Sequence, residues 1–237
     1  MRREVAMAVI ILLSTIVVTP QVSAGGLGSE DPGVSDTVTW RVGDRWVYAG
    51  SFDPTLLVQG AGVDAVVGTI NGDATTTVDA VTEVDVGGVQ TLVYQTSSKA
   101  DFDKGGVALE GYTGNLFIQY QVDEVRRVSD LAKLSTDLSL NVRYVPYGIS
   151  SLTQQIADIT ITTTYDPMSE NYDFPLRIGE TWNTSYVSST AWSGSSDYIT
   201  PFPQPTSGAN HTNWEITDVG KPVNSLGEQI GYGGCNA

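Results

Sequence analysis

Strict alternation of apolar and polar residues is the feature that most limits what this chain can fold into. It is clearest from Leu134 to Val145, where Leu, Thr, Leu, Leu, Val and Tyr take every second position and Ser, Asp, Ser, Asn and Arg the positions between. Residues 115–128 and 159–165 alternate in the same way. A two-residue period sends successive side chains to opposite faces of an extended chain, so each segment is predicted to be a half-buried β-strand. Three such strands with short connections predict an antiparallel meander.

Composition and turn residues support a protein of strands and turns. Charged residues make up 16% of the chain, while Ser, Thr and Gly are abundant. Hairpin-type turns are expected at residues 71–73, 87–88 and 105–106, which are rich in Gly. Residues 129–133 are expected to form either one short helix or a turn. The fold class is therefore predicted to be all-β and mainly antiparallel, an open half-barrel or a sandwich with at most one short helix.

A short string occurs twice at a domain-sized spacing. Residues 41–46 read Arg-Val-Gly-Asp-Arg-Trp, and residues 177–182 read Arg-Ile-Gly-Glu-Thr-Trp, an offset of 136 residues. A second string, Asp-Val-Gly at residues 85–87, recurs at residues 218–220 in the same order and at a similar spacing. A period this long indicates a duplicated unit rather than a solenoid repeat, and predicts tandem β modules.

Each copy of the first string predicts a tight turn that opens a strand. Gly43 and Gly179 are expected at positive φ, which glycine adopts at no steric cost. Trp46 and Trp182 are expected to be buried as structural anchors, one in each module. The alternative is that these tryptophans are exposed and stack on sugar rings.

The repeats also set the expected domain boundaries. We expect a first β module over residues 37–170 and a second over residues 171–237. The second is expected to be incomplete, because only 17 residues follow its last repeated string and none of them form a long alternating run. Residues 221–237 are then expected to pack loosely, with Ile216 and Val219 near an open sheet edge, unless the first module's meander covers that edge.

The start of the second module carries a resemblance to a known group of proteins. Residues 174–182 read Phe-Pro-Leu-Arg-Ile-Gly-Glu-Thr-Trp. This resembles a module start that recurs in uncharacterised secreted proteins of archaea and bacteria, whose modules are similar to β-rich half-barrels of the lipoprotein-carrier type. The first copy departs from the pattern, since Val38-Thr39-Trp40 stands where Phe-Pro-Leu would be. The resemblance implies a secreted, β-rich protein and carries no catalytic residues.

The N-terminus predicts export. Residues 1–24 have two arginines, then a mostly apolar run of 14 residues from Val5 to Val18, and small residues before Gly25, as in a cleavable signal peptide. A bilayer-spanning helix needs about 20 residues, so an uncleaved anchor is the less favoured alternative. Residues 25–36 are expected to be a flexible lead-in. The mature protein is therefore expected to be secreted or held at the cell surface, with no membrane span.

Charge and cysteine content limit the partners. The formal net charge of −15 becomes −16 after cleavage of residues 1–24. Such a surface repels nucleic acid and anionic membranes and suits cations, basic partners or a saline medium. Other cell-surface proteins or glycans are the expected partners.

Cys235 is the single cysteine, so an internal disulfide is impossible. Cys235 is expected either to form an intermolecular bond or to be a buried thiol.

Residues for catalysis are scarce. His211 is the single histidine, and no nucleophile-elbow string accompanies it, so neither catalytic nor cofactor-binding residues are expected. Asp101 and Asp103 are candidate calcium ligands, because alternating acids precede a glycine, with a polar hairpin tip as the alternative. Asn183 and Asn210 begin the triplets that accept N-linked glycans.

These observations favour a binding or structural role without catalysis. One alternative is an extracellular carrier that holds an apolar ligand on a curved sheet. Another is a secreted glycosidase-like hydrolase, which would need two carboxylates in an aromatic-lined cleft. The side chains on the concave face of the sheet are expected to distinguish these roles.

Overall fold

The computed structural model describes residues 34–35, 37–53, 55, 64–196, 204–225 and 228–236, and it describes the backbone alone at 34–35, 51–52 and beyond Ile216. The predicted signal peptide and most of the lead-in therefore lie outside the described residues. Among the described residues, no helix is long and apolar enough to cross a membrane.

The described chain is an antiparallel β protein with an open sheet, so the predicted fold class is confirmed. Nine strands follow one another across the sheet in the order β12-β11-β10-β8-β7-β6-β5-β4-β2, β3 adds to β5, and β1 pairs with β9 in a small second sheet. The strands are β1 (Val34–Ser35), β2 (Arg45–Phe52), β3 (Ala65–Val66), β4 (Ile70–Val86), β5 (Val89–Leu109), β6 (Tyr112–Arg127), β7 (Lys133–Pro146), β8 (Gln154–Ser169), β9 (Leu176–Arg177), β10 (Thr181–Ser196), β11 (Thr206–Ser225) and β12 (Glu228–Asn236). One 3-10 turn, Ser150–Leu152, follows β7, and residues 128–130 form a turn.

The predicted meander is confirmed, whereas two of the three predicted turns are wrong. Strands β6, β7 and β8 cover the three alternating segments, and Gly87 and Gly88 form the β4–β5 turn at positive φ. Gly72 lies inside β4, where a Cβ atom would come within 2.1 Å of the Phe102 ring, so this glycine makes room for an aromatic side chain. Gly106 lies inside β5, where its φ of 74° accompanies a shift in pairing to β6. Glycine permits such a bulge as readily as it permits a turn.

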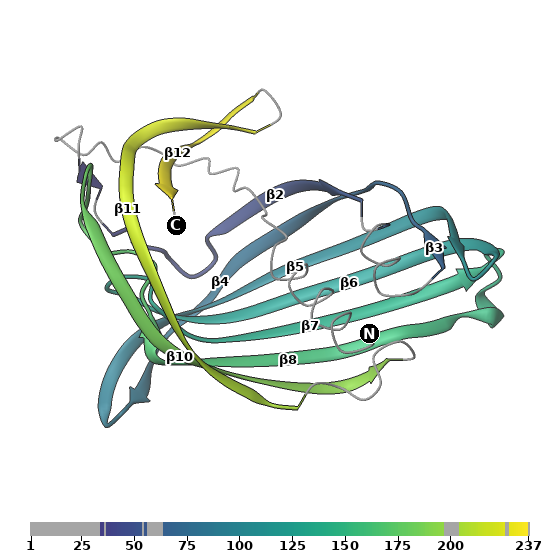
Figure 1. The fold of residues 1–237 in the computed structure, drawn as a ribbon, viewed down its shortest axis with the longest axis horizontal. Helices are drawn as coiled ribbons and strands as arrows, with labels where there is room; N and C mark the ends of the chain where they lie inside the picture. The colour runs from purple at the N-terminus through teal and green to yellow at the C-terminus, as the bar shows by residue number, and fades with distance from the viewer. Residues whose placement is uncertain are drawn as a thin grey trace.

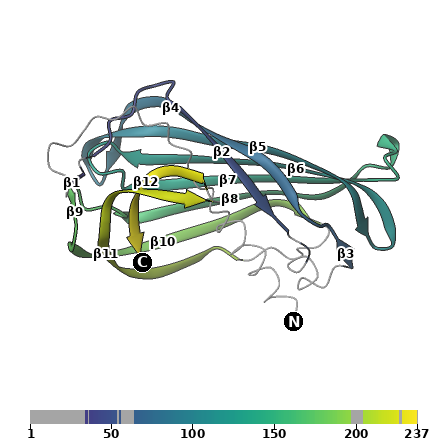
Figure 2. The ribbon, with the colours of Figure 1, turned by 90° about the horizontal axis from the view of Figure 1, so that it is seen from above.

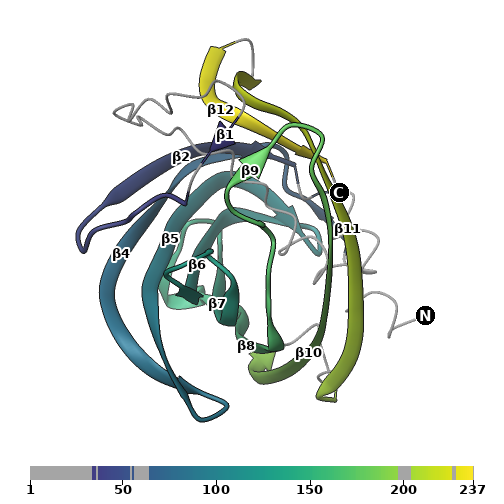
Figure 3. The same ribbon diagram turned by 90° about the vertical axis from the view of Figure 1, so that its left-hand side faces the viewer.

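The sheet curls along its width, and Figures 1 and 3 show that its backbone curves to give a concave and a convex face; we call the concave side of the curved backbone the trough. Alternation gives the sheet two different faces. One face carries exposed polar residues, such as Asp101, Asp123 and Asp137. The other carries buried and half-buried side chains, as expected where a curved sheet crowds its concave side.

Two buried clusters lie at the opposite ends of the concave face. The first is built by β3, β4, β5, β6 and β7 and comprises Ala65, Val67, Ile70, Val107, Leu109, Leu116 and Tyr144. The second comprises Val78, Tyr94 and Leu131, with Trp40, Trp46, Val128, Tyr172 and Phe174 packed against it. Figure 2 shows β1 and β9 side by side at one end of the sheet.

The repeated string folds into the same turn twice. Gly43 donates its N–H to the carbonyl of Val78 at 2.8 Å, and Gly179 donates its N–H to the carbonyl of Ile216 at 2.8 Å. In both turns the acid that follows the glycine accepts a hydrogen bond from the backbone N–H of the arginine that opens the string. Both glycines have positive φ, at 90° and 81°.

The second repeated string is not matched in structure. Gly87 forms a hairpin turn, whereas Gly220 lies within β11. The sheet also runs through the expected module boundary, because β8 pairs directly with β10. The division into two modules therefore stays a prediction within one continuous sheet.

The C-terminal strands pair at one edge of the sheet. β11 pairs with β12, and Ile216 lies opposite Cys235. Ile216 lies on β11, next to the edge strand β12, and its side chain is 1% exposed, so it is close to the edge of the sheet but covered. The side chains of Val219 and of residues 221–237 are outside the described part, so their packing stays a prediction.

Candidate binding site on the concave face

A band of large side chains crosses the middle of the concave face. It consists of Tyr120, Val122, Leu138, Ile161 and Trp192, and we call it the central band. Val122 lies opposite Leu138, Leu138 opposite Ile161, and Ile161 opposite Trp192, so the band runs across β6, β7, β8 and β10. All five side chains are half-buried, and neither end cluster includes them.

Small residues continue the band on the neighbouring strands. Ala100 lies opposite Tyr120 and Ser98 lies opposite Val122 on β5, while Ala74 and Thr76 follow on β4. The hydroxyls of Thr76 and Ser98 lie 2.7 Å apart and bond to each other. Across the sheet, the large side chains on β6, β7, β8 and β10 are thus followed by short side chains on β5 and β4.

A charged group borders the central band toward the second cluster. Glu124 follows Val122 by two positions on β6 and therefore shares its face. Its carboxylate lies 2.6 Å from Arg126 Nη2 and 2.8 Å from Lys133 Nζ. Burial raises the pKa of Glu124, but the charges of Arg126 and Lys133 outweigh this and hold it below its ordinary value. The group is therefore ionised near neutral pH, with two cations and one anion.

Three tyrosines lie close to this charged group. Burial raises the pKa of Tyr120 to about 12, and the negative charge of Glu124 adds to the effect. Burial also raises the pKa of Tyr48 and of Tyr165, with Glu124 again contributing. All three are therefore neutral at ordinary pH and keep hydroxyls that can donate hydrogen bonds.

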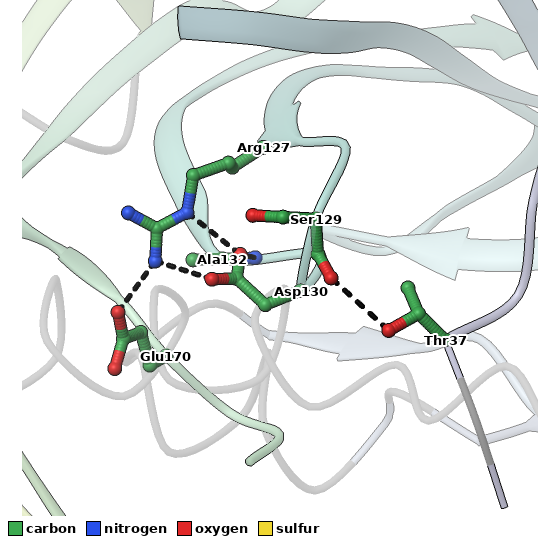
Figure 4. A network of polar contacts seen from close by, with 6 residues as sticks. All are labelled: Thr37, Arg127, Ser129, Asp130, Ala132 and Glu170. Atoms are coloured by element: carbon green, nitrogen blue, oxygen red, sulfur yellow. Dashed lines mark hydrogen bonds and ion pairs between the residues drawn. The ribbon is translucent and has the colours of Figure 1, made fainter. Parts of the chain in front are cut away.

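A network of polar contacts ties down the end of the trough beyond the second cluster (Figure 4). Arg127 Nε donates to Asp130 at 2.8 Å, and its Nη2 atom contacts both Asp130 and Glu170. The hydroxyl of Thr37 donates to the carbonyl of Ser129 at 3.0 Å. The segment before β2, the β6–β7 turn and the segment after β8 are therefore held together, which fixes the end of β6 that carries Glu124.

The predicted tryptophan anchors are half-buried, less than expected. Trp46 lies 5.2 Å from Trp40 between ring centroids, and Trp182 lies 6.1 Å from Trp214 in a stacked arrangement. Trp46 belongs to the second cluster, and Trp182 lies directly opposite Trp214 in the sheet. Each tryptophan thus packs against another tryptophan beside its repeated turn.

The predicted calcium ligands lie on the outer face. Asp101 and Asp103 are exposed side chains within β5, not at a hairpin tip, and Asp101 accepts a hydrogen bond from Gln119 Nε2 at 3.0 Å. Among the described residues, no group of three or more His, Cys, Asp and Glu side chains is placed to hold a metal ion.

The remaining predicted residues lie on β10 and β11. Asn183 is exposed, whereas Asn210 is half-buried and donates from Nδ2 to Ser188 Oγ at 2.8 Å. His211 is exposed, with its Nδ1 atom 2.8 Å from Ser185 Oγ. Of the two glycan acceptors, Asn183 is therefore the more accessible.

Sequence reasoning missed the charged group. Its signal was available, because continuing the alternation of residues 115–128 places Glu124 and Arg126 on the face that carries Tyr120 and Val122. Charged residues in apolar register are expected to be paired or functional.

Comparison of the chain with protein-family models, curated proteins and solved structures finds no match.

Proposed function

We propose that this protein is a non-catalytic binding protein, secreted or held at the cell surface, that carries an apolar ligand on the concave face of its sheet. The observation that supports it is the central band, whose five large side chains stay half-buried between two buried clusters. A trough that served only as a core would bury such side chains to the packing density of a protein interior.

The energetic basis is removal of the remaining apolar surface from water. Completing the burial of a half-buried aliphatic or aromatic side chain contributes about 0.5 kcal/mol or more at each position. Five such positions in two neighbouring rows supply enough to hold a small apolar ligand. The outer face offers no comparable band among its described residues, because its strand positions are mostly polar.

The hydrolase alternative has less support. Glycoside hydrolysis needs two carboxylates on either side of the bond that is cleaved. In the central band and the charged group beside it, Glu124 is the one carboxylate, and it is paired with Arg126 and Lys133. The proposal of export rests on residues 1–24. Other cell-surface proteins or glycans remain the proposed partners of this acidic chain.

Binding of an uncharged apolar fluorophore, such as N-phenyl-1-naphthylamine, tests the proposal. Leu138→Asn places an amide in the central band while keeping four side-chain heavy atoms branched at Cγ, and should weaken binding about tenfold. Val187→Asn is the matched control, because Val187 is 41% exposed on β10 and alternates with the inward positions. Equal binding by both variants, or no binding by the unmodified protein, would refute the proposal.

A further inference from the structure

This inference rests on the proposed function and concerns the chemistry of the ligand. We infer that the ligand is an amphiphile with one negatively charged end group, which binds to Arg126 and Lys133 while its apolar chain lies along the central band.

The charged group is itself positive. Its two cations and one carboxylate leave one positive charge in the group, in a chain whose formal net charge is −15. The three side chains are 16–25% exposed, so they are partly shielded from water yet still reachable. A charge-assisted hydrogen bond in such surroundings is stronger than one on an open surface.

Lys133 has hydrogen-bond donors that its contact with Glu124 does not use. The ammonium of Lys133 has three N–H donors, and its contact with Glu124 runs from one atom, Nζ, to one carboxylate oxygen, Oε1. Lys133 is also the most exposed of the three charged side chains, at 25%. Glu124 thus holds the two cations side by side and leaves hydrogen-bonding capacity for a second anion.

The charged group lies directly beside the central band. Glu124 lies two residues from Val122 on the same face of β6, a distance of about 7 Å along the strand. The charged group therefore begins where the central band ends. An apolar chain lying on the band and a terminal anion can belong to one molecule, and a free small anion would leave the band uncovered.

The test compares a long-chain carboxylic acid with its methyl ester, both carrying a nitroxide on the chain that quenches tryptophan fluorescence. The acid should bind the unmodified protein more tightly than the ester. Lys133→Gln should weaken binding of the acid about tenfold and leave the ester within about twofold. Glu124→Gln adds a net positive charge and should strengthen binding of the acid about threefold. Lys99→Gln, at an exposed position on β5, is the charge-matched control and should change neither.

A merely structural ion pair would behave differently, because both substitutions would then weaken binding of both compounds. The inference is overturned if acid and ester bind alike, if Lys133→Gln affects both equally, or if Glu124→Gln weakens binding of the acid. Displacement of the acid by acetate or inorganic phosphate alone would also overturn it, since the site would then recognise a free anion. Binding of the ester without any charge dependence would leave the proposed function standing, whereas no binding of either compound would remove both.

Discussion

The ammonium nitrogen of Lys133 lies 2.8 Å from a carboxylate oxygen of Glu124, on a face of the sheet whose next row of side chains is apolar. Arg126 contacts the other oxygen of the same carboxylate at 2.6 Å. Charges that leave water are tolerated where they are paired. The pairing therefore explains how charged residues can occupy apolar register in β6.

Glu124 should make stability depend on pH in the acid range. Burial raises its pKa, but Arg126 and Lys133 outweigh burial, so the folded pKa lies below the ordinary value of 4.5. The unfolded chain then binds the proton more readily, so the carboxylate stabilises the fold above about pH 4.5 and this contribution is lost as pH falls through the folded pKa. Urea unfolding at neutral pH and at about pH 3 should show a larger loss for the unmodified protein than for Glu124→Gln. Equal losses of stability in the two proteins would contradict a lowered pKa of Glu124.

Tyr120 should give the opposite dependence in alkali. Burial raises its pKa to about 12 from 10.0, so the unfolded chain loses the phenolic proton first. Stability is therefore present below pH 10 and is lost as pH rises from about 10 to about 12. Tyr120→Phe should reduce this loss in unfolding measurements, and Tyr112→Phe, at a side chain that is 51% exposed, controls for removal of a hydroxyl. A loss that is the same in both variants would count against burial of Tyr120.

Gly72 should resist substitution because of space. A Cβ atom there would lie 2.1 Å from Cδ1 of Phe102, so Gly72→Ala should lower the free energy of unfolding by about 1–3 kcal/mol. Gly105→Ala is the control, since its nearest contact would be at an ordinary 3.5 Å. Adding Phe102→Leu to Gly72→Ala should recover part of the loss. An unchanged stability of Gly72→Ala would show that the ring does not occupy this place.

The two repeated turns should respond equally to loss of their glycines. Gly43 and Gly179 have φ values of 90° and 81° with open space around the missing Cβ, so strain in the backbone is the expected cost. Each Gly→Ala change should lower the free energy of unfolding by about 1–2 kcal/mol. Gly208→Ala, which also enters open space but without a positive φ, should be close to neutral. Clearly unequal effects at Gly43 and Gly179 would argue against equivalent turns.

Alternation allowed the meander to be predicted from sequence, because a two-residue period has one structural meaning over long segments. Glycine was a poorer guide. Gly87 and Gly88 form the turn that was expected, but Gly72 accommodates Phe102 and Gly106 accompanies a bulge. A turn, a close approach and a bulge all need the missing side chain, and the local sequence does not distinguish them.

The candidate site could be predicted only in part. The apolar register of β6 was visible, including Tyr120 and Val122, but the pairing of Glu124 with Lys133 depends on the β6–β7 register. Trp192 joins the same row through β8 and β10, whose pairing also comes from the folded sheet. Long-range register of this kind is set by packing and by the turns between strands, which short motifs do not encode.

Methyl nuclear magnetic resonance with an uncharged apolar ligand shows directly whether the concave face binds such a ligand. Titration should shift the methyl signals of Val122, Leu138 and Ile161 on the concave face. Those of Val47 and Val187, which are 40% and 41% exposed, should stay in place. Shifts confined to Val47 and Val187, or no shifts in any of the five residues at saturating ligand, would contradict a binding site on the concave face.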